Sequence, residues 1–172
     1  MPNSHTLNWA TPTDHADLAD VIFDAVRNGP SKYTEAQRVA WVPVCRSGEE
    51  WDARLKGQVI AIARDGARAV GLMSLAPEGY IDFAFIRPEA QGSGLFRRLF
   101  DMIEDKVHEL LSPEPVEGSK GEPRLWTHAS LMAQPAFAAV GFTVVEHQIV
   151  QIGDEHFERA MMEKLLTAPS LL

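Results

Sequence analysis

Apolar residues recur at two different spacings along this chain, and the spacing changes near position 58. Before it they return every three or four positions, which predicts helices after Thr11-Pro12 and after the capping-box pattern Thr34-Glu35-Ala36-Gln37. After it, short apolar runs are separated by turn residues such as Asp65-Gly66, which is typical of a β-hairpin. These runs predict strands over 58–64, 69–75 and 80–86.

The longest helical pattern covers residues 95–111 and is amphipathic. Its apolar stripe comprises Phe96, Leu99, Phe100, Ile103, Val107, Leu110 and Leu111. The remaining segments are a first strand over 5–9, a polar loop over 112–123, a strand over 124–127, a helix over 131–140 and a hairpin of 142–151 and 156–165. This order predicts an α+β fold: a mixed, mostly antiparallel sheet of six to seven strands with helices on both faces.

The composition suits a single domain over residues 1–172, because 45% of the residues are hydrophobic. The formal net charge of -8 argues against a nucleic-acid partner, which usually meets a basic face. It mildly favours cationic small molecules, although net charge mainly affects solubility. The sequence has one cysteine, no signal-peptide pattern, no metal-ligand pattern and no apolar run of the ~20 residues that a membrane span needs. We therefore expect a cytoplasmic protein with no metal and no membrane partner.

The segment from Ile81 to Phe100 carries the clearest chemical signal. An apolar strand ends at Arg87-Pro88, a turn with two glycines follows, and the amphipathic helix begins directly after it. Glycines let backbone amides crowd around a charged group, and a helix N-terminus adds unpaired N–H groups and a positive dipole end. The segment therefore predicts a phosphate-binding turn.

These residues resemble those of GNAT-superfamily N-acetyltransferases. The family's pyrophosphate motif, (Arg/Gln)-x-x-Gly-x-(Gly/Ala), reads Gln91-Gly92-Ser93-Gly94-Leu95-Phe96 here, and Phe85-Ile86-Arg87-Pro88 fits the strand end before it. The run from Phe137 to Phe142 fits the family's downstream Gly-Phe region, and the element order matches over essentially the whole chain. The resemblance implies a GNAT-like sheet and acetyl-CoA as co-substrate. It also implies cofactor contacts from Phe85, Ile86, Arg87, Gln91, Gly92, Ser93, Gly94, Leu95, Phe96 and Phe137.

Two residues depart from the family pattern. Phe96 stands where the motif has Gly or Ala, and we expect its ring to turn into the apolar stripe while its amide faces the phosphate. Phe137 stands where many members have the tyrosine that reprotonates the departing thiolate, and phenylalanine has no proton to give. The family's usual acid is therefore absent from this chain.

An alkyl amine must lose a proton before it attacks, so a base or a water chain is expected. By resemblance, strand 80–86 and the strand that ends at His128 flank the pantetheine arm. Four polar side chains on these segments are candidates for proton transfer: Tyr80, Asp82, His128 and Ser130. Their structural alternatives are packing for Tyr80, surface or cap pairing for Asp82, a hydrogen-bonded structural role for His128 and a helix N-cap for Ser130. Tyr33, between the first two helices, is a candidate for the acceptor pocket.

The resulting hypothesis is an enzyme that moves acetyl from acetyl-CoA to a primary amine, by direct attack in a ternary complex. We expect a small-molecule acceptor rather than a protein. The alternative is a non-catalytic CoA-binding sensor or interaction module, which Phe137 keeps open, and a further one is an unrelated phosphate binder. A homodimer through the C-terminal strands is expected by analogy.

Overall fold

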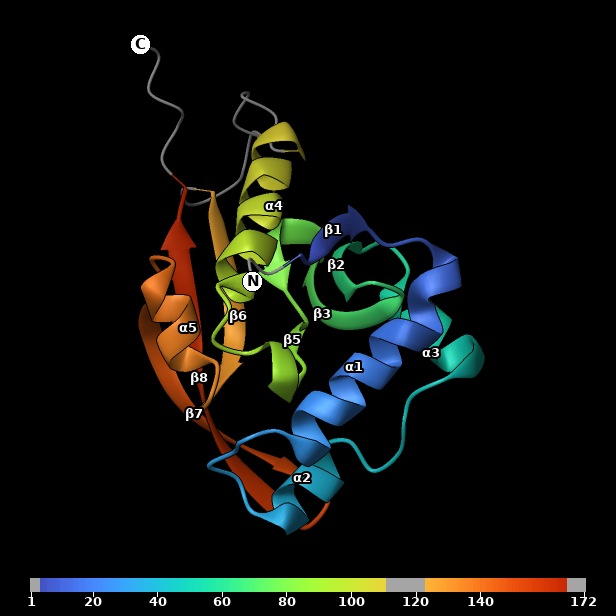
Figure 1. Cartoon of the computed structure of the whole chain (residues 1–172). Coiled ribbons are helices and arrows are strands. Elements are labelled where there is room, and N and C mark those ends of the chain that lie inside the picture. The colour runs from blue at the N-terminus through green and yellow to red at the C-terminus, as the bar shows by residue number, and fades with distance from the viewer. Residues whose placement is uncertain (1–3, 111–122, 167–172) are drawn as a thin grey trace.

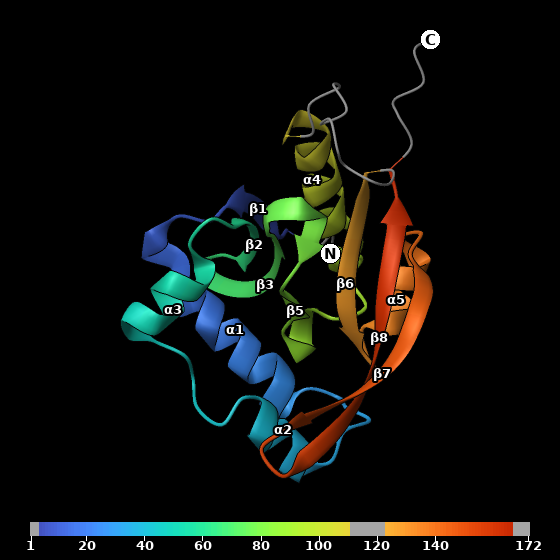
Figure 2. The same cartoon turned by 180° about the vertical axis from the view of Figure 1, so that it is seen from behind.

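Two four-stranded sheets form the centre of the molecule, for which the computed structural model describes residues 4–110 and 123–166. The first sheet is built, in spatial order, from β1 (Thr6–Trp9), β2 (Val59–Asp65), β3 (Arg68–Leu75) and β5 (Ala84–Ile86). The second is built from β4 (Tyr80–Ile81), β6 (Arg124–Ser130), β8 (Glu155–Leu165) and β7 (Thr143–Ile152). Figures 1 and 2 show the sheets side by side, with α4 (Leu95–Leu110) running along their junction.

Helices cover both faces of the first sheet because its strands are apolar on both sides. Along β2, Ile60 and Ile62 pack into a core with α1 (His15–Asn28) and α3 (Gly48–Leu55), whereas Ala61 and Ala63 pack into the core that contains α4. This period of two is the strand alternation that the sequence predicts. The mixed α+β class with helices on both faces is confirmed.

The predicted strand over 80–86 is in fact two strands. β4 pairs in parallel with β6, whereas β5 pairs antiparallel with β3. At the break, the Phe83 amide donates to the Ser74 hydroxyl (2.9 Å), and the Ser74 amide donates to the Phe83 carbonyl (2.8 Å). This draws β5 toward β3 and away from β6. The described residues therefore form eight strands in two sheets, whereas the sequence predicted one sheet of six to seven strands. β5 and β6 belong to different sheets and diverge from each other (Figure 2).

Most other elements follow the sequence pattern, with shifted ends. The Thr34–Gln37 capping box is formed at the start of α2 (Glu35–Trp41), and the β7–β8 hairpin is present. The helix expected over 131–140 is shorter, because Pro135 fits only the first turn, and α5 spans Gln134–Ala139. Of the loop expected over 112–123, all but Pro123 lies outside the described residues. No helix in the described part of the chain is long and apolar enough to cross a membrane.

Candidate active site

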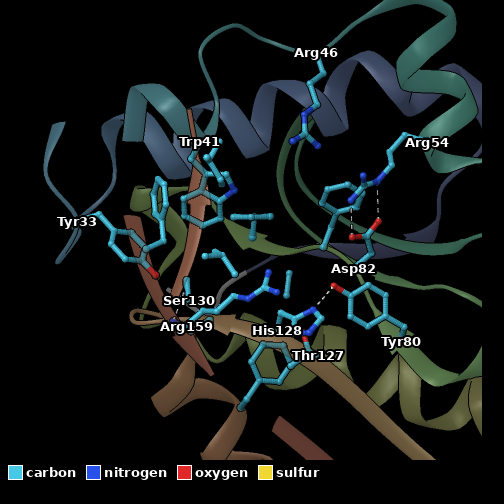
Figure 3. Close-up of a pocket in the computed structure, with 18 residues that line it drawn as sticks. Tyr33, Trp41, Arg46, Arg54, Tyr80, Asp82, Thr127, His128, Ser130 and Arg159 are labelled. Atoms are coloured by element: carbon cyan, nitrogen blue, oxygen red, sulfur yellow. Dashed lines mark hydrogen bonds and ion pairs between the residues drawn. The ribbon is translucent and has the colours of Figure 1, made fainter. Parts of the chain in front are cut away.

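Two cavities meet where β5 and β6 diverge. The first, here called the glycine groove, has a volume of about 560 Å³ and lies between the Gly92–Gly94 turn, β5 and the start of α5. The second, here called the polar cavity, has a volume of about 200 Å³ and is lined by polar side chains of β4, β6 and β8 (Figure 3). Five residues line both: Trp41, Ala84, Phe85, Ser130 and Ala133. A ligand that fills the groove can therefore present one end to the polar cavity.

The glycine turn has the backbone that a phosphate-binding site needs. Gly92 and Gly94 have φ of 74° and 80°, a conformation that L side chains rarely adopt. A Cβ at either position would meet nothing within 4 Å, so the absent side chains leave open space beside the backbone. Among the described residues, no acceptor lies within hydrogen-bonding distance of the amides of Gly92, Gly94 and Leu95. Free amides at the start of a helix are the groups with which proteins commonly bind anions, so this turn is a candidate anion site.

Most of the predicted cofactor residues surround this groove. Those that line it are Phe85, Ile86, Gln91, Gly92, Gly94, Leu95 and Phe96. Ser93 lies in the turn but is not a lining residue, and its hydroxyl donates to the Ala90 carbonyl (2.6 Å). Phe96 is partly buried and its ring packs edge-on against Phe137, as expected for a side chain turned toward the core.

The prediction for Arg87 needs correction. Its guanidinium is 4% exposed and pairs with Asp20 (2.6 Å) and Asp24 (3.0 Å) on α1. Its Nε donates to the Ala69 carbonyl (2.6 Å), and its amide donates to the Val70 carbonyl (2.8 Å). Arg87 therefore ties α1 to the first sheet, and its buried side chain is not among the residues that line the glycine groove.

The backbone of Phe85 faces β3, so a cofactor contact from this residue would come from its side chain. The Phe83 carbonyl accepts from the Ser74 amide of β3, and the Arg87 amide donates to the Val70 carbonyl of β3. Backbone groups of every second residue point to the same side of a strand, so those of Phe85 also face β3. The backbone groups at the open edge are those of Ala84 and Ile86. Phe85 lines both cavities through its side chain.

Tyr80 and His128 meet in the polar cavity. The Tyr80 hydroxyl lies 3.0 Å from Nδ1 of His128, and the Trp126 ring lies 4.4 Å from the Tyr80 ring. Burial, and secondly the nearby Arg159 charge, lowers the pKa of His128 below its ordinary 6.5. Burial raises the pKa of the Tyr80 phenol, and the Asp82 charge adds to this effect. Near neutral pH the pair therefore consists of an uncharged imidazole and an uncharged phenol.

Asp82 also lines the polar cavity, but both its carboxylate oxygens are occupied. Arg54 donates to them through Nε (3.1 Å) and Nη2 (2.9 Å), and the Gln58 amide donates to Oδ2 (2.9 Å). The expected strand alternation from Tyr80 to Asp82 does not exist, because β4 ends at Ile81. Asp82 thus anchors Arg54 at the rim of the cavity.

Ser130 lines both cavities, and Tyr33 lines the polar cavity. The Ser130 hydroxyl accepts from the Ala133 amide (3.3 Å) before α5, and no acceptor for its own proton lies within reach among the described residues. The Tyr33 hydroxyl donates to the Glu158 carbonyl (2.5 Å) and accepts from the Leu131 amide (3.1 Å). Tyr33 therefore lines the pocket with its ring, and its hydroxyl links β8 to the end of β6.

Phe137 is placed differently from the other predicted cofactor residues. Its ring is 1% exposed, contacts Phe96 and Phe142 edge-on, and lines the polar cavity rather than the groove. Direct cofactor contact from Phe137 stays a prediction, and in the structure its side chain is a wall of the polar cavity.

The sequence analysis named none of the arginines that line the polar cavity: Arg46, Arg54 and Arg159. Trp41 is a wall of both cavities, and its ring lies 5.9 Å from that of Phe85. Arg159 shares a strand face with the buried Phe157, and a charge on an apolar face was a readable signal. Arg46 lies in the loop before α3, which has no pattern that could have placed it.

Comparison with known proteins decides the family. The family model described as an acetyltransferase (GNAT) domain matches residues 30–166, well over half of the chain. This chain belongs to the GNAT acetyltransferase family. Its sequence is 29% identical over 152 residues to that of the uncharacterized N-acetyltransferase YafP of Escherichia coli K12. The aligned region covers 88% of this chain and 89% of YafP.

Solved structures show the same fold. A GCN5-related N-acetyltransferase from Rhodopseudomonas palustris superposes with a TM-score of 0.80 at 25% identity, covering 96% of this chain and 98% of that one. The yncA protein of Salmonella typhimurium, solved with its cofactor acetyl-CoA, gives a TM-score of 0.62 at 17% identity, covering 98% and 99% of the two chains. The paia N-acetyltransferase of Thermoplasma acidophilum, solved with coenzyme A, gives 0.65 at 13% identity, covering 95% and 99%.

Proposed function

We propose that this GNAT protein transfers the acetyl group of acetyl-CoA to a primary amine of a small molecule, by direct attack in a ternary complex. The observation that carries the proposal is the junction of the two cavities. The glycine groove suits a long phosphorylated cofactor, and the polar cavity beside it holds the titratable pair Tyr80 and His128. Acceptor and acyl donor would meet between Ala84 and Ser130.

The residues present fit acetyl-CoA, which supplies an activated acyl thioester when bound. The amides of Gly92, Gly94 and Leu95 would hold its pyrophosphate. The open edge at Ala84 and Ile86 would pair with amide groups of its pantetheine arm, as an added strand would. One carbonyl at this edge is partly engaged, because the Gln91 side chain donates to Ile86 (3.1 Å).

Proton transfer is assigned to Tyr80 and His128 acting together. As the amine nitrogen bonds to the acyl carbon it becomes positive, and its proton becomes acidic. The Tyr80 oxygen takes this proton while its own proton moves to Nδ1 of His128, 3.0 Å away. The hydroxyl of Ser130, which has no acceptor among the described residues, would pass a proton to the leaving sulfur and regain one from solvent, while His128 releases the amine's proton to solvent, so that one proton moves in net from nitrogen to sulfur.

The size of the polar cavity supports a small acceptor. Its volume of about 200 Å³ lies below the ~300–1,000 Å³ typical of pockets for drug-sized ligands. The test is a screen of primary amines with acetyl-CoA, measuring free thiol release. We expect free thiol only when an amine is present and only with protein whose glycine groove binds acetyl-CoA. Acetyl-CoA binding without thiol release across a broad set of amines would instead support a sensor or interaction module.

A homodimer is also proposed. β7 is the edge strand of the second sheet, and four of its apolar side chains are exposed: Val144, Val145, Ile149 and Ile152. Exposed apolar edges often pair with another strand. Light scattering after size exclusion would show a particle of about 38 kDa for a dimer of 19.0 kDa chains, and a monomer would contradict it.

A further inference from the structure

The polar cavity is positively charged although the whole chain carries a net charge of -8. Three arginines line it, Arg46, Arg54 and Arg159, against a single carboxylate, Asp82. Asp82 is neutralised by Arg54, with Nη2 and Oδ1 2.9 Å apart. The charges of Arg46 and Arg159 therefore remain, and the local field is opposite in sign to that of the protein as a whole.

Arg46 is held in place without a counter-ion. Its guanidinium carbon lies 5.5 Å from the centroid of the Trp51 ring and 5.7 Å from that of Phe83. Figure 3 shows its head group directed from the loop before α3 toward the cavity. In the described part of the chain no carboxylate forms an ion pair with it. Burial, and secondly the charge of Arg54, lowers the pKa of the Arg46 guanidinium, and the charge of Asp82 offsets only part of this shift.

Arg159 approaches the same space from the opposite side. It projects from β8, and its Nε donates to the amide oxygen of Gln148 (2.9 Å). Figure 3 shows its side chain directed toward His128, and its charge contributes to the lowered pKa of that histidine. Within residues 4–110 and 123–166 it too has no carboxylate partner. Two arginines without anions thus face one small cavity.

These charges are not explained by the cofactor. Neither Arg46 nor Arg159 lines the glycine groove, where the phosphates of acetyl-CoA would lie. An arginine fork is well suited to bind a planar carboxylate or a tetrahedral oxyanion through two parallel hydrogen bonds. The remaining walls, including Trp41, Phe85 and Phe157, are apolar and suit a short hydrocarbon body.

We propose that the acceptor is an anionic amine, in which a carboxylate or phosphonate is held by Arg46 and Arg159 and the amino group meets Tyr80 and His128. An amino acid is the simplest member of this class. The inference rests on the proposed acetyltransferase function and adds the charge of its acceptor. It also replaces the weak expectation of a cationic substrate, which was drawn from net charge alone.

The test compares acceptors that differ only at the anionic group. Phenylalanine, its primary amide, phenethylamine and the aminophosphonate analogue of phenylalanine would be assayed with acetyl-CoA by thiol release, followed by a matched leucine series. We expect kcat/KM about tenfold to hundredfold higher for the acids than for the amide and the amine, the range for a lost charge-assisted hydrogen bond. Activity with only the carboxylate, or only the phosphonate, identifies which oxyanion the site takes.

Variants separate this inference from the proposed function. Arg46→Gln and Arg159→Gln should each remove most of the preference for the acid, while Arg68→Gln, an exposed arginine paired with Glu89, should preserve it. Equal or better turnover of phenethylamine by the wild-type protein would overturn the anionic acceptor and leave the acetyltransferase function intact. No thiol release with any amine would overturn the function, and the inference with it. Binding of N-acetylphenylalanine, but not its amide, to the CoA-loaded protein gives a second readout without turnover.

Discussion

The hydroxyl of Tyr80 and Nδ1 of His128 lie 3.0 Å apart although 48 positions separate them in the chain. The parallel pairing of β4 with β6 creates this contact, because it aligns Tyr80 with Trp126, two residues before His128 on the same strand face. The break after Ile81 then opens the sheet directly beside the pair. A two-residue strand thus places the proposed proton-transfer groups at the mouth of the cofactor groove.

Removing either member of this pair should slow the chemical step. His128→Gln should lower kcat by about 10²–10⁴-fold, the usual contribution of a positioned acid or base, and Tyr80→Phe should have a comparable effect. Affinity for acetyl-CoA, measured by calorimetry, should not change, because neither residue lines the groove. His147→Gln, an exposed histidine on β7, is the matched control. A kcat within threefold of wild type in both variants would refute this assignment.

The His128 imidazole should titrate below pH 6.5. Burial is the main cause and the Arg159 charge the second, so Arg159→Gln should move the pKa of His128 upward. As the pH falls below 6.5, the His128 imidazole is protonated in the unfolded chain before it is protonated in the native protein. The free energy of unfolding should therefore decrease from about this pH until the pH has passed the pKa of His128 in the native protein. An NMR titration gives the pKa directly, and His128→Gln should flatten this part of the stability profile. A His128 pKa above 6.5 would contradict the prediction.

Gly94→Val should abolish cofactor binding in a folded protein. The substitution costs about 1–2 kcal/mol for the left-handed backbone, and its side chain would enter the open space beside the turn amides. Gly153→Val is a close control, since this hairpin glycine also has positive φ (60°) and open space around its Cβ. Both variants should melt at similar temperatures, and only Gly94→Val should lose the thermal shift with CoA. An equal shift in the two would place the cofactor elsewhere.

Asp82→Asn distinguishes an anchor from a base. Because Asp82 holds Arg54 through two hydrogen bonds, the variant should release Arg54 and change KM for the acceptor, while lowering kcat by less than about tenfold. Asp65→Asn, at the exposed end of β2, supplies the control. A hundredfold loss of kcat at unchanged KM would instead make Asp82 the base.

The sequence was most informative where local chemistry determines structure. The glycine turn, the amphipathic α4 and the Thr34 capping box depend on neighbours within a few positions, and each was predictable from its own segment. The rotation of Phe96 toward the core also followed from helical spacing alone.

Features set by distant partners could not be found this way. The break at Asp82 depends on Arg54, Gln58 and Ser74, none of which is a neighbour in the sequence. The resemblance implied a cofactor contact from Arg87, and its own segment could not show that Asp20 and Asp24 of α1 pair with it. The arginines of the polar cavity come from a loop and a strand 113 positions apart, so only the folded chain shows that Arg46 and Arg159 share one site.

A crystal structure of the protein with coenzyme A tests the central claim most directly. We predict the pyrophosphate on the amides of Gly92 and Gly94, the pantetheine arm along Ala84 and Ile86, and the sulfur at the junction near Ser130, facing Tyr80 and His128. A cofactor bound away from this turn, or a sulfur that does not reach the junction, would contradict it.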